Sequence, residues 1–192
     1  MAGIGVFGGT FNPPHLGHQR LVRRFADRLS LSEVLIIPTY IPPHKRANEL
    51  ASSGERLEMC RLMFSGDSRF RVSSIEIDRG GKSYTYDTLK ELKRIYPDDR
   101  LYLIVGSDML RSFCSWHRPD DILKLCTVCA AARDGGGVPP NISHKVIFDD
   151  MEPLLISSTA IREMAGKNGD ITGLVGEAVA GYISQRGLYA QG

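Results

Sequence analysis

Two histidines stand three positions apart directly after a glycine-rich turn. The segment Gly8-Gly9-Thr10-Phe11-Asn12-Pro13-Pro14-His15-Leu16-Gly17-His18 follows a short apolar run, Ile4–Phe7. Glycines lack a Cβ and so let backbone N–H groups approach an anionic oxygen closely. If a helix begins near Leu16, both imidazoles lie on one face of its first turn, beside the free N–H groups and the positive dipole end. This arrangement suits a reaction in which negative charge spreads over phosphate oxygens, and it requires no nucleophilic side chain.

A second candidate phosphate site lies near the other end of the chain. Its sequence is Ile156-Ser157-Ser158-Thr159-Ala160-Ile161-Arg162, in which the hydroxyl residues stand just before a helix start. Hydroxyl caps and exposed N–H groups at a helix start can cradle an anion, and Arg162 can add a bidentate contact to a terminal phosphate. An ordinary N-cap, which contributes about 1 kcal/mol to a helix, is the alternative. The presence of the histidine segment favours the phosphate site.

Short apolar runs alternate with helical patterns along the chain. Most of the runs are continuous, as in strands buried on both faces of a sheet. We expect strands at Ile4–Phe7, Val34–Ile37, Phe70–Ile77, Leu101–Val105, Cys126–Ala132 and Lys145–Phe148. Helical stripes run over Leu21–Leu29, over Leu57–Phe64 after a capping box from Ser52 to Glu55, and over Leu89–Tyr96, where Pro97 stops the helix. The alternation predicts an α/β fold, a Rossmann-like doubly wound parallel sheet with right-handed crossovers.

The predicted fold places the two candidate phosphate sites at the same edge of the sheet. In an open parallel sheet, ligands bind beyond the carboxyl ends of the strands, at the switch point where the strand order reverses. The two candidate phosphate sites follow predicted strands. We therefore expect them to meet at that edge of the sheet.

Composition and charge favour one enzyme domain, residues 1–192. The chain is 42% hydrophobic, which is enough to bury one core, and its 24 Lys and Arg against 22 Asp and Glu give a net charge of only +2. That balance does not favour nucleic acid as a partner. The sequence shows neither a basic leader nor an apolar run near eighteen residues, so we expect no membrane association and a cytoplasmic protein. Four cysteines without a signal peptide indicate a reducing compartment.

Two partial motifs are interpreted as structural. Gly3-x-Gly5-x-x-Gly8 has the spacing of the dinucleotide fingerprint of dehydrogenases, but two of its glycines precede or fall inside the first strand instead of opening a helix. Cys126-x-x-Cys129 lies in an apolar stretch without a second pair at ligand spacing, which favours core packing over redox or zinc chemistry. We therefore expect no metal held by protein ligands.

The histidine segment resembles the first motif of the nucleotidyltransferase superfamily, His-x-Gly-His after a strand. Ile156-Ser157-Ser158-Thr159-Ala160-Ile161-Arg162 resembles its second motif. Within the superfamily the chain is similar, essentially end to end, to bacterial nicotinate-nucleotide adenylyltransferases. The further segments that carry this likeness are Ile37-Pro38, Pro42-Pro43-His44-Lys45, Ser83-Tyr84-Thr85, Gly106-Ser107-Asp108, Trp116 and Gly187-Leu188-Tyr189.

The resemblance implies adenylyl transfer from ATP to nicotinate mononucleotide, with Mg²⁺ accompanying ATP. Pyrophosphate would leave and deamido-NAD would form, a step of NAD biosynthesis. His15, His18 and Arg162 would be the catalytic residues. The ATP-binding residues would be Gly8, Gly9, Thr10, Phe11, Gly106, Asp108, Ile156, Ser157, Ser158 and Thr159. A homo-oligomer is compatible with the family.

The acceptor nucleotide would be bound by a separate set of residues. The resemblance places Lys45, Tyr84, Thr85, Trp116 and Arg133 in this set. Tyr84 and Thr85 resemble the backbone donors to the substrate carboxylate, and Trp116 resembles the ring that stacks on the pyridine. Helix capping for Tyr84, Thr85 and Asp108, and a place in the core for Trp116, are the competing roles.

Departures from the family pattern leave other functions open. Asn12 stands where the motif often has aspartate, and Tyr40 where an asparagine would contact the mononucleotide phosphate. A sibling transferase acting on nicotinamide mononucleotide or phosphopantetheine would share the phosphate machinery. A nucleotide-binding sensor without turnover is a third hypothesis, although a sensor has no need of His15, His18 and Arg162.

Overall fold

A computed structural model describes residues 2–42, 50–131, 142, 145–152 and 154–190. It contains one six-stranded sheet in the order β3-β2-β1-β4-β5-β6, and all five pairings are parallel. The strands are β1 (Gly3–Gly9), β2 (Glu33–Pro38), β3 (Phe70–Val72), β4 (Arg100–Val105), β5 (Thr127–Ala131) and β6 (Val146–Asp149). The predicted Rossmann-like α/β fold is therefore confirmed, and the strand order reverses between β1 and β4.

Helices cover both faces of the sheet. They are α1 (Leu16–Arg28), α2 (Ser53–Phe64), α3 (Ile75–Arg79), α4 (Thr85–Ile95), α5 (Ser107–Arg111), α6 (Pro119–Leu125), α7 (Ser158–Gly166), α8 (Thr172–Val175) and α9 (Glu177–Arg186), with a 3₁₀ turn at Phe113–Ser115. The three predicted helices correspond to α1, α2 and α4. The capping box of α2 is present, because Glu55 N–H donates to Ser52 Oγ at 3.2 Å and Ser52 N–H donates to Glu55 Oε2 at 2.8 Å.

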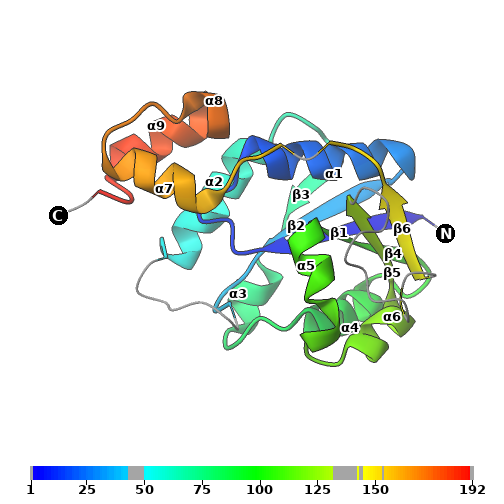
Figure 1. Cartoon of the computed structure of the whole chain (residues 1–192). Helices are drawn as coiled ribbons and strands as arrows, with labels where there is room; N and C mark the ends of the chain where they lie inside the picture. The colour runs from blue at the N-terminus through cyan, green and yellow to red at the C-terminus, as the bar shows by residue number, and fades with distance from the viewer. Residues whose placement is uncertain (1, 43–49, 132–141, 143–144, 153, 191–192) are drawn as a thin grey trace.

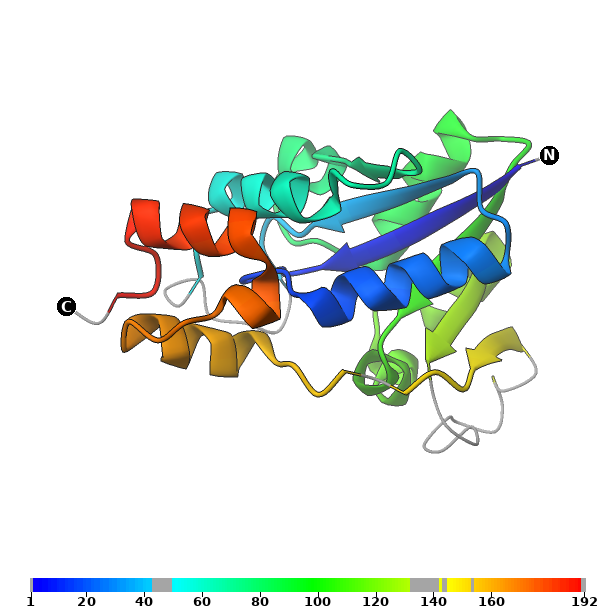
Figure 2. The ribbon, with the colours of Figure 1, turned by 90° about the horizontal axis from the view of Figure 1, so that it is seen from above.

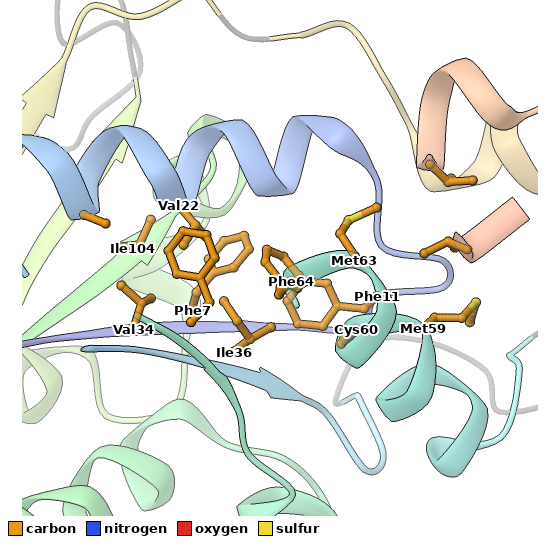
Figure 3. Packing of buried hydrophobic residues seen from close by; sticks show 14 of the residues in the cluster. Phe7, Phe11, Val22, Val34, Ile36, Met59, Cys60, Met63, Phe64 and Ile104 are labelled. Carbon is orange, nitrogen blue, oxygen red and sulfur yellow. The ribbon is translucent and has the colours of Figure 1, made fainter. Parts of the chain in front are cut away.

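The core lies in two layers, one on each face of the sheet. On one face α1 packs against the strands, and α4 and α6 cover the other (Figure 1). The first layer continues past the ends of the strands, where the Phe11 ring lies edge-to-face with that of Phe64 of α2, with centroids 6.5 Å apart (Figure 3). Helices α7, α8 and α9 lie beyond the carboxyl ends of β1 and β2 (Figure 1, Figure 2). The C-terminal part of the chain is thus placed beside the predicted ligand edge.

The third predicted strand, Phe70–Ile77, is wrong beyond Val72. Strand β3 ends there, and Ile75–Arg79 form α3. The helical turn is closed by Asp78 N–H donating to Ser74 O at 2.8 Å, while Ser74 Oγ donates to the Asp78 carboxylate at 2.7 Å. Alternating isoleucines suit a strand or a short helix equally, and the serine that begins the turn decides between them.

The two partial motifs have structural roles. Gly3, Gly5 and Gly8 all lie inside β1, so none of them opens a helix, and a Cβ on Gly5 would come within 2.9 Å of Val34 Cγ1. Burial raises the pKa of the Cys126 and Cys129 thiols to about 12, which fits packing and not reactivity. Among the described residues, no helix is both long and apolar enough to cross a membrane.

Candidate active site

A cavity of about 820 Å³ opens at the carboxyl edge of the sheet. Residues at or just after the ends of five strands line it: Gly8 and Gly9 at the end of β1, Thr39 after β2, Gly106 after β4, Ala131 at the end of β5 and Met151 after β6. The cavity therefore spans the switch point between β1 and β4, where open α/β sheets bind ligands.

The two histidines lie at the start of α1, as the spacing predicts. The helix begins at Leu16, with His15 as its N-cap residue. His15 N–H donates to His18 Nδ1 at 3.1 Å, and the two rings stack with centroids 3.6 Å apart and planes 24° apart. Because Nδ1 accepts a hydrogen bond, neutral His18 carries its proton on Nε2. The hydrogen-bond donor of neutral His18 is therefore Nε2–H.

The Phe11 ring packs edge-to-face against the ring of His18. Phe11 is 2% exposed, and its ring centroid lies 5.2 Å from that of His18 and 5.5 Å from that of Phe7. Figure 3 shows Phe7 among the core side chains between the sheet and α1, and Phe11 beside Phe64 of α2. The Phe11 side chain is therefore a core residue that fixes the loop, and its predicted contact with ATP stays a prediction.

His15 is buried, and burial lowers its pKa from 6.5 to about 4. The folded protein therefore keeps His15 neutral at pH 5, where the unfolded chain protonates it. Since the unfolded state then binds more protons, stability falls as the pH drops from about 6.5 towards 4. We expect His15 to account for about 2 kcal/mol of the stability lost between pH 7 and pH 5.

Urea unfolding of the protein and of His15→Gln at the two pH values measures this contribution. The glutamine variant serves as the control for carboxylates that titrate in the same range, and it should lose less stability on acidification. Equal losses in both proteins would contradict a neutral buried His15.

Gly17 leaves the space that the His15 ring occupies. A Cβ at this position would lie 3.0 Å from His15 Nδ1 and 3.2 Å from Cε1. Alanine suits a helix better than glycine. Gly17→Ala therefore separates an effect on the position of the His15 ring from an effect on the stability of α1. We expect kcat to fall by about tenfold or more, because a displaced ring disturbs the stacked pair, while the thermal midpoint changes little. Unchanged kcat would show that the position of His15 is not critical.

The second candidate segment meets the first across the rim of the cavity. Ser158 Oγ donates to Pro13 O at 2.9 Å, and Arg162 Nη1 donates to Asn12 O at 3.0 Å. These bonds join residues 145 and 150 positions apart in the sequence. The predicted meeting of the two segments at one edge of the sheet is therefore observed.

The hydroxyls of the second segment already have partners within the protein. Ser157 is the N-cap of α7, and its Oγ accepts from Ala160 N–H at 3.1 Å. Thr159 Oγ1 accepts from Arg162 Nη2 at 3.4 Å. The capping alternative thus holds for the Ser157 side chain. The N–H groups of Ser158 and Thr159, which have no acceptor inside the helix, remain as the candidate anion donors of this segment.

The comparisons with known proteins agree with this geometry. The Cytidylyltransferase-like family matches residues 6–164. A probable nicotinate-nucleotide adenylyltransferase of Geobacillus thermodenitrificans is 40% identical over 189 residues, covering 98% of this chain and 87% of the relative. The nicotinate-nucleotide adenylyltransferase of Bacillus subtilis is 35% identical, covering 98% of this chain and 99% of the relative. The chain belongs to the nicotinate-nucleotide adenylyltransferase family.

A solved structure supports the fold of this adenylyltransferase family member. The Plasmodium falciparum nicotinic acid mononucleotide adenylyltransferase, in complex with NaAD, superposes with a TM-score of 0.81 at 20% identity, covering 98% of both chains. At that identity the likeness concerns the fold. The resemblance inferred from the sequence motifs is confirmed at the level of the family.

The predicted adenosine segment lies at the start of α5. Gly106 is the N-cap of this helix, so Asp108 is not, and the capping alternative for Asp108 is wrong. Asp108 lies in the first turn, lines the cavity and forms an ion pair with Arg111. Its side chain is 81% exposed, which leaves it accessible to a ligand in the cavity.

The predicted acceptor residues gather on another wall of the cavity. Tyr84 is the N-cap of α4 and Thr85 its first residue, and both line the cavity together with Trp116. The Trp116 ring is half-buried, packs on Phe113 with centroids 5.3 Å apart, and donates from Nε1 to Ser112 Oγ at 3.3 Å. The ring thus has both a core contact and a side that lines the cavity. Lys45 and Arg133 lie outside the described residues.

Other predicted residues are placed as follows. The cavity lining includes Thr10 and Ile156. Thr159 is not part of that lining, and its hydroxyl contacts Arg162. For these residues, contact with a nucleotide stays a prediction.

Some polar side-chain atoms of the cavity lining have no hydrogen-bond partner among the described residues. Within the described residues, three buried side-chain atoms lack a hydrogen-bond partner: His15 Nδ1, Thr39 Oγ1 and Glu76 Oε2. All three residues line the cavity. Buried polar groups are nearly always hydrogen-bonded, so these atoms are available to a polar ligand or to water in the cavity. Burial also raises the pKa of Glu76.

Sequence reasoning missed several residues that hold the site together. Asn12, 1% exposed, accepts at Oδ1 from Ala51 N–H at 3.0 Å and from Tyr189 OH at 2.9 Å, while its carbonyl accepts from Arg162. A turn residue thus joins three distant parts of the chain. Thr39 and Glu76 were also missed, because an isolated hydroxyl or carboxyl carries no local signal of an unmet hydrogen bond.

Proposed function

We propose that this protein transfers the adenylyl group of ATP to nicotinate mononucleotide, forming deamido-NAD and pyrophosphate. The observation that carries the proposal is the meeting of two phosphate-type helix starts at one cavity, through the Ser158–Pro13 and Arg162–Asn12 hydrogen bonds. Membership of the nicotinate-nucleotide adenylyltransferase family supports the same reaction.

The transfer needs positioning and charge stabilisation more than covalent catalysis. An oxygen of the acceptor phosphate attacks the α-phosphorus of ATP, and the bond from that phosphorus to the bridging oxygen breaks, releasing pyrophosphate. The start of α1 would hold the α-phosphate, with Gly8, Gly9 and Thr10 approaching it closely. The His18 Nε2–H would donate to the oxygens that gain charge in the transition state. Neutral His15 would support the His18 ring through the stacked contact.

The β- and γ-phosphates would lie at the start of α7. The N–H groups of Ser158 and Thr159 and the guanidinium of Arg162 would bind them, with Ile156 and Ser157 shaping the approach. Gly106 and Asp108 would hold the adenosine half. With ATP bound in this way, the acceptor nucleotide would lie against the cavity wall formed by Tyr84, Thr85 and Trp116.

Magnesium would enter with ATP. Among the described residues, no group of three His, Cys, Asp or Glu side chains could hold a metal ion. Mg²⁺ commonly binds through substrate phosphates and water with few protein ligands, so the phosphates would be its main ligands here. When bound, it neutralises part of the triphosphate charge.

The start of α4 favours an acidic acceptor over its amide. This helix runs for 11 residues from Thr85. Its first residue lines the cavity, so the positive end of its dipole and its first N–H groups lie at the cavity wall. A carboxylate gains from both, whereas a neutral amide gains little. Lys45 and Arg133 are proposed as further acceptor residues from the family pattern.

Turnover with defined acceptors tests the proposal. The protein is incubated with Mg-ATP and either nicotinate mononucleotide, nicotinamide mononucleotide or phosphopantetheine, and pyrophosphate and the adenylylated product are followed. We expect the highest kcat/KM with nicotinate mononucleotide. Preference for another acceptor would identify a sibling transferase, and tight ATP binding without any product would identify a sensor.

A further inference from the structure

A buried guanidinium lies between the two substrate regions. Arg56, in the second turn of α2, is 1% exposed. It donates three hydrogen bonds to backbone carbonyls: from Nε to Ala51 O at 3.0 Å, from Nη1 to Thr10 O at 2.8 Å and from Nη2 to Tyr40 O at 3.0 Å. Within the described parts of the chain, no ion pair joins Arg56 to a carboxylate. Among the described residues, the hydrogen-bond partners of the guanidinium are therefore backbone carbonyls.

The two distal carbonyls belong to the two substrate loops. Thr10 lies in the turn that leads from β1 to the histidine pair, in the proposed ATP site. Tyr40 lies after β2, and its N–H donates to Ser83 Oγ at 2.9 Å, while Ser83 N–H donates to Ile41 O at 3.0 Å. Ser83 directly precedes the Tyr84–Thr85 wall of the proposed acceptor site. A continuous set of hydrogen bonds therefore runs from the ATP loop through Arg56 to the acceptor wall.

Arg56 is the donor to three backbone carbonyls that belong to separate parts of the chain. An apolar side chain of similar volume would leave these carbonyl oxygens without this donor. A guanidinium offers what an apolar side chain lacks, a planar set of donors in fixed directions. This rigid donor set fixes where the Thr10 and Tyr40 carbonyls lie relative to each other.

We propose that Arg56 is a positioning residue that sets the separation of the two reacting phosphates by holding the ATP loop at Thr10 and the acceptor loop at Tyr40. The proposal rests on the proposed adenylyl transfer. It concerns kcat more than binding, because each substrate keeps its own direct contacts while their mutual alignment is lost. A misplacement of about 1 Å can reduce a rate by about 10²-fold.

Substituting the guanidinium while keeping its charge tests the proposal. In Arg56→Lys the ammonium cannot reach three carbonyls in the same plane. We expect kcat to fall by about tenfold or more, with the KM values for ATP and for nicotinate mononucleotide each changing by less than about threefold, as befits lost alignment. The matched control is Arg61→Lys on the same helix. Arg61 is exposed and pairs only with Glu58, at 3.2 Å, among the described residues, so its kinetics should be unchanged.

The kinetics of two variants distinguish a positioning role of Arg56 from a purely structural one. Wild-type kcat in Arg56→Lys, with or without a lower thermal midpoint, would reduce Arg56 to a structural residue. If that variant fails to fold, Ser83→Ala cuts the same connection at its acceptor end, and it should lower kcat while leaving the KM for ATP unchanged. A fully active Ser83→Ala would overturn the proposal. Inactivity of the wild-type protein with nicotinate mononucleotide would instead refute the proposed function itself.

Discussion

His18→Ala is expected to lower kcat by about 10²-fold or more, the scale for removing one donor to a charged transition state. The structure gives the reason, since the His15 N–H bond to His18 Nδ1 at 3.1 Å leaves the proton on Nε2, where it can serve a phosphate oxygen. The ring is half-buried at the helix start, so the fold should survive its removal. Steady-state kinetics, with circular dichroism to verify folding, measure the effect.

Two amide variants separate the roles of the two ring nitrogens. The amide nitrogen of Gln reaches approximately as far as Nε2, and that of Asn approximately as far as Nδ1. We therefore expect His18→Gln to keep more activity than His18→Asn. If His18→Ala retains a near-normal rate, or if the order of the two amides is reversed, donation from Nε2 is not part of the mechanism.

The second large effect is expected at Arg162. Replacing this residue by Gln should lower kcat/KM for ATP by about 10²-fold, since charge-assisted hydrogen bonds contribute about 1.5–3 kcal/mol each. Arg162→Lys keeps the charge but loses the planar pair of donors, so we expect a fall of about tenfold. Kinetics at varied ATP and fixed acceptor measure both.

The matched control for Arg162 lies on the same helix. Lys167 is the exposed C-cap residue of α7, and Lys167→Gln makes the same change of charge away from the cavity. Its kinetics should equal those of the wild type. Because Arg162 also bonds Asn12 O at 3.0 Å, the Arg162 variants should be slightly less stable, and a loss of stability without any loss of kcat/KM would show that Arg162 only fastens α7 to the loop.

Local spacing was enough to predict the histidine pair and most of the sheet. His15 and His18 share a face because three positions are nearly one helical turn, and the buried strands are visible as continuous apolar runs. The end of β3 was not predictable in this way, because Ile75 and Ile77 fit a strand until Ser74 begins a turn. The meeting of α1 and α7 at one edge followed from the general geometry of parallel sheets.

The supporting contacts could not be predicted from the sequence. Arg56 in a helical pattern is indistinguishable from an exposed arginine, and only the fold shows that it faces three carbonyls. Ser157 and Ser158 were expected to bind phosphate, yet their hydroxyls bond Ala160 N–H and Pro13 O. Hydrogen-bond partners that are distant in sequence leave no local pattern, because only tertiary packing brings them together.

The hydrogen bond from Tyr189 OH to Asn12 Oδ1 joins residues 177 positions apart. During synthesis on the ribosome, Asn12 is therefore made 177 residues before this partner. All six strands precede Tyr189 in the chain, so the sheet can assemble before this contact at the rim of the cavity forms. A truncation that removes Tyr189 would thus leave the scaffold intact while loosening the turn that carries His15 and His18.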